Sequence, residues 1–321
     1  MALRLPDRWI WDSWYIWHDG LCHAFYLSAS KGLVDPDRRH RYTSVGHAVS
    51  EDLTNWEVLP DALAPSDSPA FDSWTTWTGS VVQVGPKHWR MFYTGTSRED
   101  KGAVQRILAA DSTDLVSWHK VPGFVLEASR AHYEVLQDGS WPDECWRDPW
   151  VYFSDAAKRW EMLVTARAVG ASGQTGGVVG FATSENLDDW EVLQPLTEPV
   201  SDFGHLEVLQ FEVVDGTPIL LFSCDADKLS AHRRQGLGNV DATYSLACPD
   251  GLTGLNLSKA QPFQGDQVYA SRLVRDGEGK WNLLGFHNYR NGQFLGEICS
   301  PIPVSATVEH GLFVDANREI L

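Results

Sequence analysis

The sequence Trp11-Asp12-Ser13-Trp14 opens a strand-like run that leads through the turn His18-Asp19-Gly20 into an aromatic-rich run at residues 22–27. The same arrangement of opening motif, short turn and apolar strand recurs four more times along the chain. The recurring positions are 67, 69, 59 and 63 residues apart and are Asp12, Gly79, Asp148, Glu207 and Ala270. Such a repeat indicates copies of one supersecondary unit that are packed around a common core.

A second repeated element follows each hairpin. It is an alternating strand-like run and a turn that ends in tryptophan, with copies at residues 46–56, 108–118 and 180–190 and weaker copies at 244–252 and 295–301. Short strands that recur at a regular interval, with little helical periodicity, are typical of propeller blades. We therefore predict an all-β protein, a five-bladed β-propeller with four-stranded antiparallel blades around a central pocket. Residues 1–321 are predicted to form one domain.

Three of the five repeats carry an acid where the first strand opens, namely Asp12, Asp148 and Glu207. The innermost strand of each propeller blade lines the central channel, so these three side chains are predicted to meet in one pocket and to be catalytic. A lone acid would be better explained as a solvated strand end, but three at equivalent positions favour a shared chemical role. Glu212 lies further along its strand and is not expected to reach the axis.

Composition narrows the classes of partner. The chain has 26 Lys plus Arg against 43 Asp plus Glu, a net charge of −17, which opposes binding to nucleic acid or an anionic membrane surface. No apolar run approaches the roughly 20 residues of a membrane span, and the first residues lack the apolar core of a secretion signal, so we expect a cytoplasmic protein. The five cysteines are widely spaced and are expected to be reduced structural thiols. No cofactor and no metal ion in the site are expected, and the sequence leaves open a structural calcium ion and the oligomeric state.

Tryptophans gather at the predicted strand openings and in the loops that lead to them. Flat aromatic faces suit the C–H faces of a sugar, and carboxylates and arginine can bind its hydroxyls through charge-assisted hydrogen bonds. We therefore expect a small carbohydrate as the ligand, with contacts from Trp11, Trp14, Trp77, Ser80, Arg147, His205 and Tyr269. About half of the tryptophans are expected to fill space between blades, above all Trp56, Trp118 and Trp190.

Two long irregular segments, residues 121–144 and 225–240, flank strands that carry catalytic candidates. Long connections in a compact fold commonly serve function, so both are predicted to shape the mouth of the pocket. The second contains the basic run His232-Arg233-Arg234, which we interpret as solvated, with binding of a sugar phosphate as the alternative. Residues 302–321 are predicted to close the ring or to pack under it.

Three motifs resemble known families. Trp11-Asp12-Ser13-Trp14 resembles the nucleophile motif of glycoside hydrolase family 68, the levansucrases, and more loosely that of family 32, the invertases and inulinases. Trp77-Thr78-Gly79-Ser80 is similar to their Trp-Ser-Gly-Ser segment, and Arg147-Asp148-Pro149 matches their Arg-Asp-Pro motif. Where these families usually carry Glu-Cys-Pro or Glu-Arg-Pro, this chain has Glu207-Val208-Leu209.

The resemblance implies clan J, whose five-bladed propellers cleave or transfer β-fructofuranosyl units with retention of configuration. It implies that Asp12 is the nucleophile, that Glu207 is the general acid/base, and that Asp148, assisted by Arg147, stabilises the transition state. We expect a propeller alone, as in family 68, without the β-sandwich that family 32 enzymes add.

Cleavage of a furanosidic bond needs one carboxyl to protonate the leaving oxygen and another to stabilise the anomeric carbon. Leu206 and Val208 are expected to favour the protonated form of Glu207, while Asp12 stays ionised. The expected function is a retaining hydrolase for terminal β-D-fructofuranosyl units of sucrose-like or short fructo-oligosaccharides, with fructosyl transfer as a side activity. Three alternatives stay open: an inverting family 43-like α-L-arabinofuranosidase or β-xylosidase, a phosphorylase on the same propeller, and a sugar-binding propeller without turnover.

Overall fold

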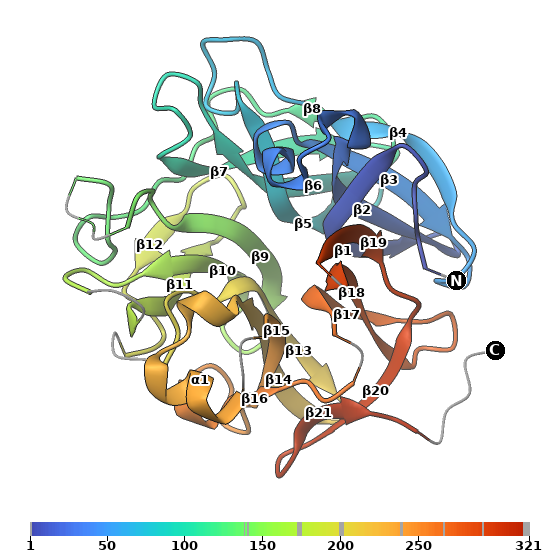
Figure 1. Cartoon of the computed structure of the whole chain (residues 1–321). Helices are drawn as coiled ribbons and strands as arrows, with labels where there is room; N and C mark the ends of the chain where they lie inside the picture. Colours follow the sequence, from blue (N-terminus) through green and yellow to red (C-terminus); the bar gives the residue numbers. More distant parts are fainter. Residues whose placement is uncertain are drawn as a thin grey trace.

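Five antiparallel sheets surround a common axis, and the chain runs once around the ring (Figure 1). This computed structural model describes residues 2–137, 139, 141–171, 175–198, 202–237, 240–265, 267–290 and 292–316. The fold class predicted from the repeat, a five-bladed β-propeller, is confirmed. None of the helices in these ranges is long and apolar enough to cross a membrane.

In each blade the first strand is the innermost, and later strands pair outward. The first blade contains β1 (Arg8–His18), β2 (Leu21–Ser30), β3 (Ser44–Ser50) and β4 (Glu57–Leu63). The second contains β5 (Thr75–Gly85), β6 (His88–Thr96), β7 (Gln105–Ser112) and β8 (His119–Lys120). The third contains β9 (Trp146–Ser154), β10 (Arg159–Arg167), β11 (Gly177–Ser184) and β12 (Glu191–Leu193).

The last two blades follow the same plan. The fourth contains β13 (Glu207–Val214), β14 (Thr217–Cys224), β15 (Ala242–Ala247) and β16 (Gln261–Pro262). The fifth contains β17 (Tyr269–Arg275), β18 (Trp281–Arg290), β20 (Ile302–Thr307) and β21 (Gly311–Val314), and β19 (Gln293–Ile298) also pairs with β18. The described part of the predicted tail therefore forms the outer strands of the fifth blade. The first residues of the chain also pair with the fifth blade, because Leu3 and Ile298 exchange backbone hydrogen bonds of 3.0 and 3.1 Å.

Every innermost strand carries a β-bulge near its start, which adds one residue relative to the paired strand. The first residue of the bulge is Asp12, Thr78, Asp148, Val208 or Ala270, and four of these have positive φ: 24°, 59°, 54° and 48° for Asp12, Asp148, Val208 and Ala270. The register corrects the sequence alignment at two places, because Thr78 and Val208 stand where Gly79 and Glu207 were expected. Glu207 therefore lies one residue before the bulge.

The tryptophan-ended turns are alike in three blades. Trp56, Trp118 and Trp190 each donate their indole N–H, over 3.0–3.1 Å, to the carbonyl of the leucine three residues earlier. Their rings belong to or pack against the hydrophobic clusters between blades, as expected. The side chain of the first turn residue, Ser50, Ser112 or Ser184, caps the turn by accepting a backbone N–H.

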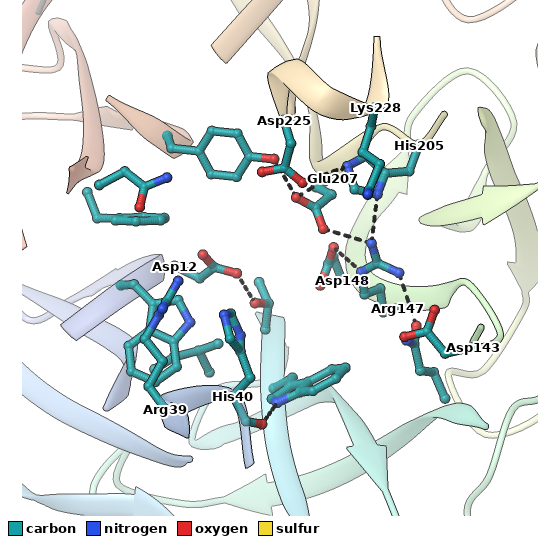
Figure 2. Close-up of a pocket in the computed structure, with 18 of the residues that line it drawn as sticks. Asp12, Arg39, His40, Asp143, Arg147, Asp148, His205, Glu207, Asp225 and Lys228 are labelled. Atoms are coloured by element: carbon teal, nitrogen blue, oxygen red, sulfur yellow. Dashed lines mark hydrogen bonds and ion pairs between the residues drawn. The ribbon is translucent and has the colours of Figure 1, made fainter. Parts of the chain in front are cut away.

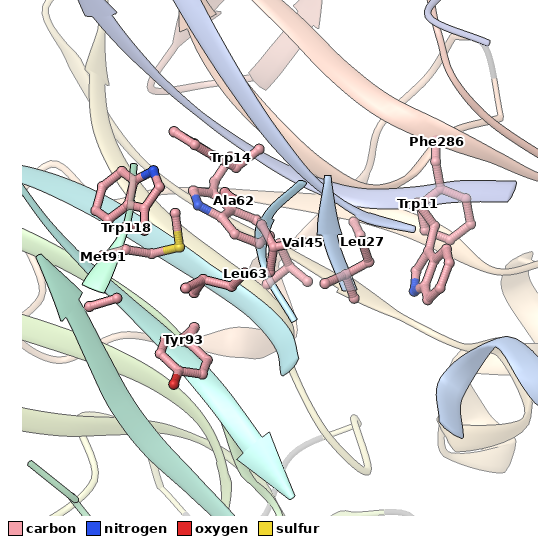
Figure 3. Close-up of a cluster of buried hydrophobic side chains, with 14 of the residues drawn as sticks. Trp11, Trp14, Leu27, Val45, Ala62, Leu63, Met91, Tyr93, Trp118 and Phe286 are labelled. Atoms are coloured by element: carbon pink, nitrogen blue, oxygen red, sulfur yellow. The ribbon is translucent and has the colours of Figure 1, made fainter. Parts of the chain in front are cut away.

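Large apolar side chains fill the space between neighbouring blades. The cluster between the first two blades includes Trp14, Phe25, Met91, Tyr93 and Trp118 (Figure 3). Trp14 is fully buried and stacks on Phe25 with 6.3 Å between ring centroids. Each fully buried large side chain contributes about 1.5–3 kcal/mol or more, so these clusters hold the blades at the spacing that shapes the central cavity.

The two long segments differ from one another. Residues 121–137, 139 and 141–144 hold no helix or strand, only isolated bridges at Leu126 and Tyr133. Residues 225–240, expected to be irregular, contain a 3₁₀ turn (Ala226–Lys228) and the helix α1 (Ala231–Leu237). A helix of two turns is too short to show a periodic apolar pattern, and it begins where the Ser230 hydroxyl accepts the Arg233 N–H.

Candidate active site

A cavity of about 650 Å³ opens where the five innermost strands begin. Each of these strands contributes one residue to its wall at an equivalent register position: Trp11, Trp77, Arg147, Glu207 and Tyr269. We call these five residues the cavity ring. All five were among the residues predicted for the site, and the bulge that follows each one turns the next residue toward the same space in three blades.

Those three bulge residues are Asp12, Thr78 and Asp148, and all line the cavity. The Thr78 hydroxyl donates to Asp12 Oδ2, across the boundary between the first two blades. Asp148 Oδ2 accepts from the Thr165 hydroxyl at 3.0 Å and from the Val208 N–H at 3.3 Å. Positive φ at a non-glycine residue is strained, and Asp tolerates it better than most, so the bulges hold these two carboxyls in fixed directions.

Glu207 faces the cavity among hydrogen-bond donors (Figure 2). Arg147 Nη2 donates to Glu207 Oε1 at 2.7 Å, and the Tyr269 hydroxyl donates to Oε2. His205 Nε2 lies 3.7 Å from Oε2. Asp12, Asp148 and Glu207 thus line one cavity, as the repeat predicted.

The electrostatics differ from the expectation for two of the three acids. Burial and then the Asp148 charge raise the pKa of Asp12 to about 7, and burial raises the pKa of Asp148. Burial alone would also raise the pKa of Glu207, but His205, Arg147 and the Tyr269 hydroxyl together lower it to about 2. The expected apolar setting of Glu207 is wrong because Leu206 and Val208 are buried in hydrophobic clusters, while the Glu207 side chain lines the cavity.

His205 lies beside Glu207 and Asp225, and ligand atoms of these three residues lie within 4.8 Å of one another, a spacing that could hold a metal ion. The contacts of His205 oppose that use. Arg147 Nη2 can only donate, so His205 Nδ1, 3.1 Å away, accepts, and a neutral imidazole then carries its hydrogen on Nε2. Nε2 faces Asp225 Oδ2 at 3.3 Å, which suits an N–H rather than a metal-binding lone pair.

Both long segments reach the cavity, as predicted. Trp141, Pro142 and Asp143 come from the first segment, and Asp225 and Lys228 come from the second. Two cations lie over the Trp141 ring, with Arg167 at 4.1 Å and Lys228 at 5.6 Å from the ring centroid.

Sequence reasoning missed several wall residues. The 3₁₀ turn Pro36–Arg41 supplies Arg39, His40 and Arg41, and single side chains come from Gln105 and Asn288. Only the density of basic residues at 38–41 could have signalled this turn. The other basic run, His232-Arg233-Arg234, does not contribute to the cavity wall. Its Arg233 packs over the rings of Phe203 and Tyr244 and donates to a backbone carbonyl.

Trp14 and Ser80 were expected to contact substrate, and the structure places both away from the cavity. Each lies three residues after the cavity ring on its strand, one layer deeper along the axis. Trp14 belongs to the hydrophobic core, and the buried Ser80 hydroxyl accepts the Val151 N–H at 3.1 Å. In these two blades the bulge lets both the cavity-ring residue and the residue after it line the cavity, and the side chain three positions after the cavity ring lies in the interior. Glu212 does not line the cavity, as expected.

Comparison with known proteins supports a common family. The family model "Glycosyl hydrolases family 32 N-terminal domain" matches residues 6–293. A sucrose-6-phosphate hydrolase of Bacillus subtilis is 28% identical over 256 residues, covering 75% of this chain and 47% of that protein. A β-fructofuranosidase insoluble isoenzyme of Arabidopsis thaliana is 28% identical over 298 residues, covering 87% of this chain and 47% of that protein. The chain thus spans about half the length of these relatives.

Solved structures show the same fold. An inulosucrase from Halalkalicoccus jeotgali bound to kestose has a TM-score of 0.76 at 21% identity, covering 94% of this chain and 86% of that one. A Bombyx mori β-fructofuranosidase has a TM-score of 0.72 at 22% identity, covering 95% and 62%. With the family model matched along most of its length and the propeller fold shared, the chain belongs to glycosyl hydrolase family 32.

Proposed function

We propose that the protein is a retaining glycoside hydrolase that cleaves terminal β-D-fructofuranosyl units from sucrose-like or short fructo-oligosaccharides, with fructosyl transfer as a side activity. The observation that carries the proposal is the meeting of Asp12, Asp148 and Glu207 in one cavity of sugar size, whose wall also contains Trp11 and Trp77. The family model and the names of the relatives support fructosides as the substrate class.

In this mechanism Asp12 attacks the anomeric carbon while Glu207 donates a proton to the leaving oxygen, so the C–O bond of the glycoside breaks as an ester to Asp12 forms. Glu207 then takes a proton from water, whose oxygen displaces Asp12 with a second inversion. Asp148 and Arg147 bind sugar hydroxyls and stabilise the positive charge that develops on the ring. A cytoplasmic location stays a prediction.

The protons of the three carboxyls belong to the cluster as a whole. In the free protein the donors around Glu207 favour its ionised form, and the raised pKa of Asp12 favours protonation there. Glu207 becomes an acid when it binds the proton, which requires the Arg147 and Tyr269 donors to turn to another acceptor. The hydroxyls of a bound sugar are such acceptors, so substrate binding favours transfer of the shared proton to Glu207.

The test is NMR of the sugar first released from β-fructosides and α-L-arabinofuranosides, for the wild type and for Asp12→Asn and Glu207→Gln, which keep shape and lose the charge. We expect fructose with retained configuration, and loss of turnover in both variants. Arabinose or xylose released with inversion would support the family 43-like alternative, and turnover that depends on phosphate would support the phosphorylase. Sugar binding without turnover in the wild type would support the binding propeller.

A phosphorylated disaccharide is a second candidate substrate. Arg39, Arg41 and Lys228 line the cavity, and Arg41 Nη1 is buried with no acceptor among the described residues. A phosphate group would supply one. We expect a higher kcat/KM for sucrose 6-phosphate than for sucrose, and Arg41→Gln to lower that preference. Arg38→Gln is the control, because Arg38 is in the same turn but outside the cavity wall; equal kcat/KM values for both sugars in the wild type would refute this candidate.

A further inference from the structure

One fully buried arginine lies in the layer beneath the cavity ring. Arg272 is on β17, three residues after Tyr269, at the register position that Trp14, Ser80, Trp150 and Gln210 occupy in the other blades. It is 1% exposed. Four of the five blades thus place an uncharged side chain at this level, and the fifth places a cation.

The guanidinium of Arg272 reaches across the axis. Nη1 donates to the carbonyls of Val208, at 3.3 Å, and Leu209 in the fourth blade, and Nη2 lies 3.5 Å from the Gly79 carbonyl in the second. Its centre lies 4.9 Å from the ring centroid of Trp150 in the third blade. Arg272 therefore contacts three blades besides its own, and its position is set by backbone atoms that do not move freely.

Among the described residues, no carboxylate is in direct contact with the Arg272 guanidinium. Other buried arginines in the described chain have one, such as Arg90 with Asp111 at 2.7 Å and Arg167 with Glu134 at 3.3 Å. For Arg272, the acids whose attraction counts are the cavity residues Asp148 and Asp12. A buried cation whose partners are carbonyls and one aromatic ring is costly, so its presence at this level calls for a reason beyond packing.

The two acids in the layer above Arg272 are close to other negative charges. Asp12 and Asp148 repel one another, and Glu207 adds a third negative charge. The Thr78 and Thr165 hydroxyls and the Val208 N–H stabilise them as neutral donors. Arg147 binds Glu207, and its Nε lies 3.6 Å from Asp148 Oδ2, so it serves two of the three acids. Among the described residues, no cation forms an ion pair with Asp12, and Arg39 lies at the cavity wall at 4.0 Å from the ring centroid of Phe294. Burial lowers the pKa of Arg272 itself to about 10, which leaves it positively charged at neutral pH.

We propose that Arg272 is a positioning residue of the active site, whose buried guanidinium supplies positive charge from below that offsets the mutual repulsion of Asp12 and Asp148 and favours their ionised forms. This inference rests on the proposed function insofar as it assigns these carboxyls to catalysis. It gives Arg272 an electrostatic task that the neutral residues at the same level in the other blades do not have.

The test is a ¹³C NMR titration of aspartate carboxyl carbons, with Asp12 assigned from Asp12→Asn, in the wild type, Arg272→Gln and Arg272→Lys. Arg272→Gln is expected to raise the titration midpoint of the Asp12 and Asp148 signals by on the order of one pH unit. Arg272→Lys keeps the charge but cannot bridge several carbonyls with a planar fork, so it should melt at a lower temperature while keeping the wild-type midpoint. The alkaline limb of kcat/KM should move with the NMR midpoint.

Arg90→Gln is the matched control, because Arg90 is also buried but its partners, Asp111 and Asp188, lie outside the cavity. It should lower the melting temperature without moving the midpoint. If Arg272 merely holds blades together, Arg272→Gln will lower the melting temperature without moving the midpoint, as Arg90→Gln does, and the proposal is overturned. A shifted midpoint in Arg272→Lys also overturns it, and this second outcome decides the question if Arg272→Gln does not fold. The titration needs no substrate, so a wild type that cleaves no fructoside would refute the proposed function and still leave the role of Arg272 decided.

Discussion

Replacing Thr78 by valine removes the hydroxyl that donates to Asp12 Oδ2 and keeps the shape of the side chain. Hydrogen bonds to charged groups contribute about 1.5–3 kcal/mol, which corresponds to roughly one to two units of pKa. Asp12 is partly accessible to water in the cavity, so we take the lower end, about one unit. The hydroxyl lowers a pKa that burial and Asp148 raise to about 7, so its loss raises that pKa further.

The sign of the effect on activity follows from the role of Asp12. The active form of the cluster holds one proton, which lies on Asp12 in the free protein and must pass to Glu207, so activity is lost as pH rises through the Asp12 pKa of about 7 and that proton leaves. The alkaline limb of kcat/KM should therefore move up by about one pH unit in Thr78→Val, and at a pH below both midpoints kcat/KM should fall about tenfold, because Asp12 holds the proton more tightly.

The assay is kcat/KM for sucrose or kestose from pH 4 to pH 9, with Thr78→Ser as the matched control because serine keeps the hydroxyl. Thr78→Ser should retain the wild-type alkaline limb. If Thr78→Val and Thr78→Ser have the same alkaline limb, the hydrogen bond does not set the ionisation of Asp12, and the assignment of Asp12 as the group that holds the shared proton loses its support.

Other predictions concern the core and the thiols. Burial lowers the pKa of His23 to about 4 and of His47 to about 3, so the stability that these neutral histidines contribute is present above their unfolded pKa of about 6.5 and is lost as pH falls through it toward the folded values. Between pH 8 and pH 5 the free energy of unfolding in urea should fall by about 4 kcal/mol, about 2 kcal/mol for each histidine. The double variant His23→Phe/His47→Phe should lack this fall, and an equal pH dependence in both proteins would contradict the prediction. Trp14→Ala should lower the free energy of unfolding by about 3–5 kcal/mol without raising KM, whereas Trp11→Ala should raise KM, and the opposite pattern would return Trp14 to the substrate site. All five cysteines are free and buried, and burial raises the pKa of Cys145 to about 12, so a thiol reagent should modify no cysteine in the native protein and five after denaturation.

Features that depend on local chemistry could be predicted from the sequence. The serine, leucine and tryptophan of each repeated turn form the same hydrogen bonds in three blades, because all their partners lie within a few residues. The alternation of apolar residues defined the strands, and the interval between repeats defined the blades. Membership of the cavity wall could be predicted for eight of ten candidates, since innermost strands of a propeller must open at one place.

Features that depend on how distant segments of the chain meet could not be predicted from the sequence. The wall residues Arg39 and Asn288 come from connections whose course is set by packing against other blades, and no local pattern marks them. The same holds for the charge state of Glu207: its neighbours in sequence are apolar, but Arg147, His205 and Tyr269 come to its carboxylate from other strands and loops.

The sequence by itself determined a five-fold repeat, the strands of each blade and the three acids that open three of them. Only the tertiary structure decided which residue of each opening faces the cavity. A β-bulge inserts one residue where each inner strand begins, and because side chains alternate between faces, that one residue decides what lies in the cavity and what lies beneath it. Trp14 and Ser80 thereby pass to the interior layer, which Arg272 shares, and the carboxyls of Asp12, Asp148 and Glu207 come to face one another.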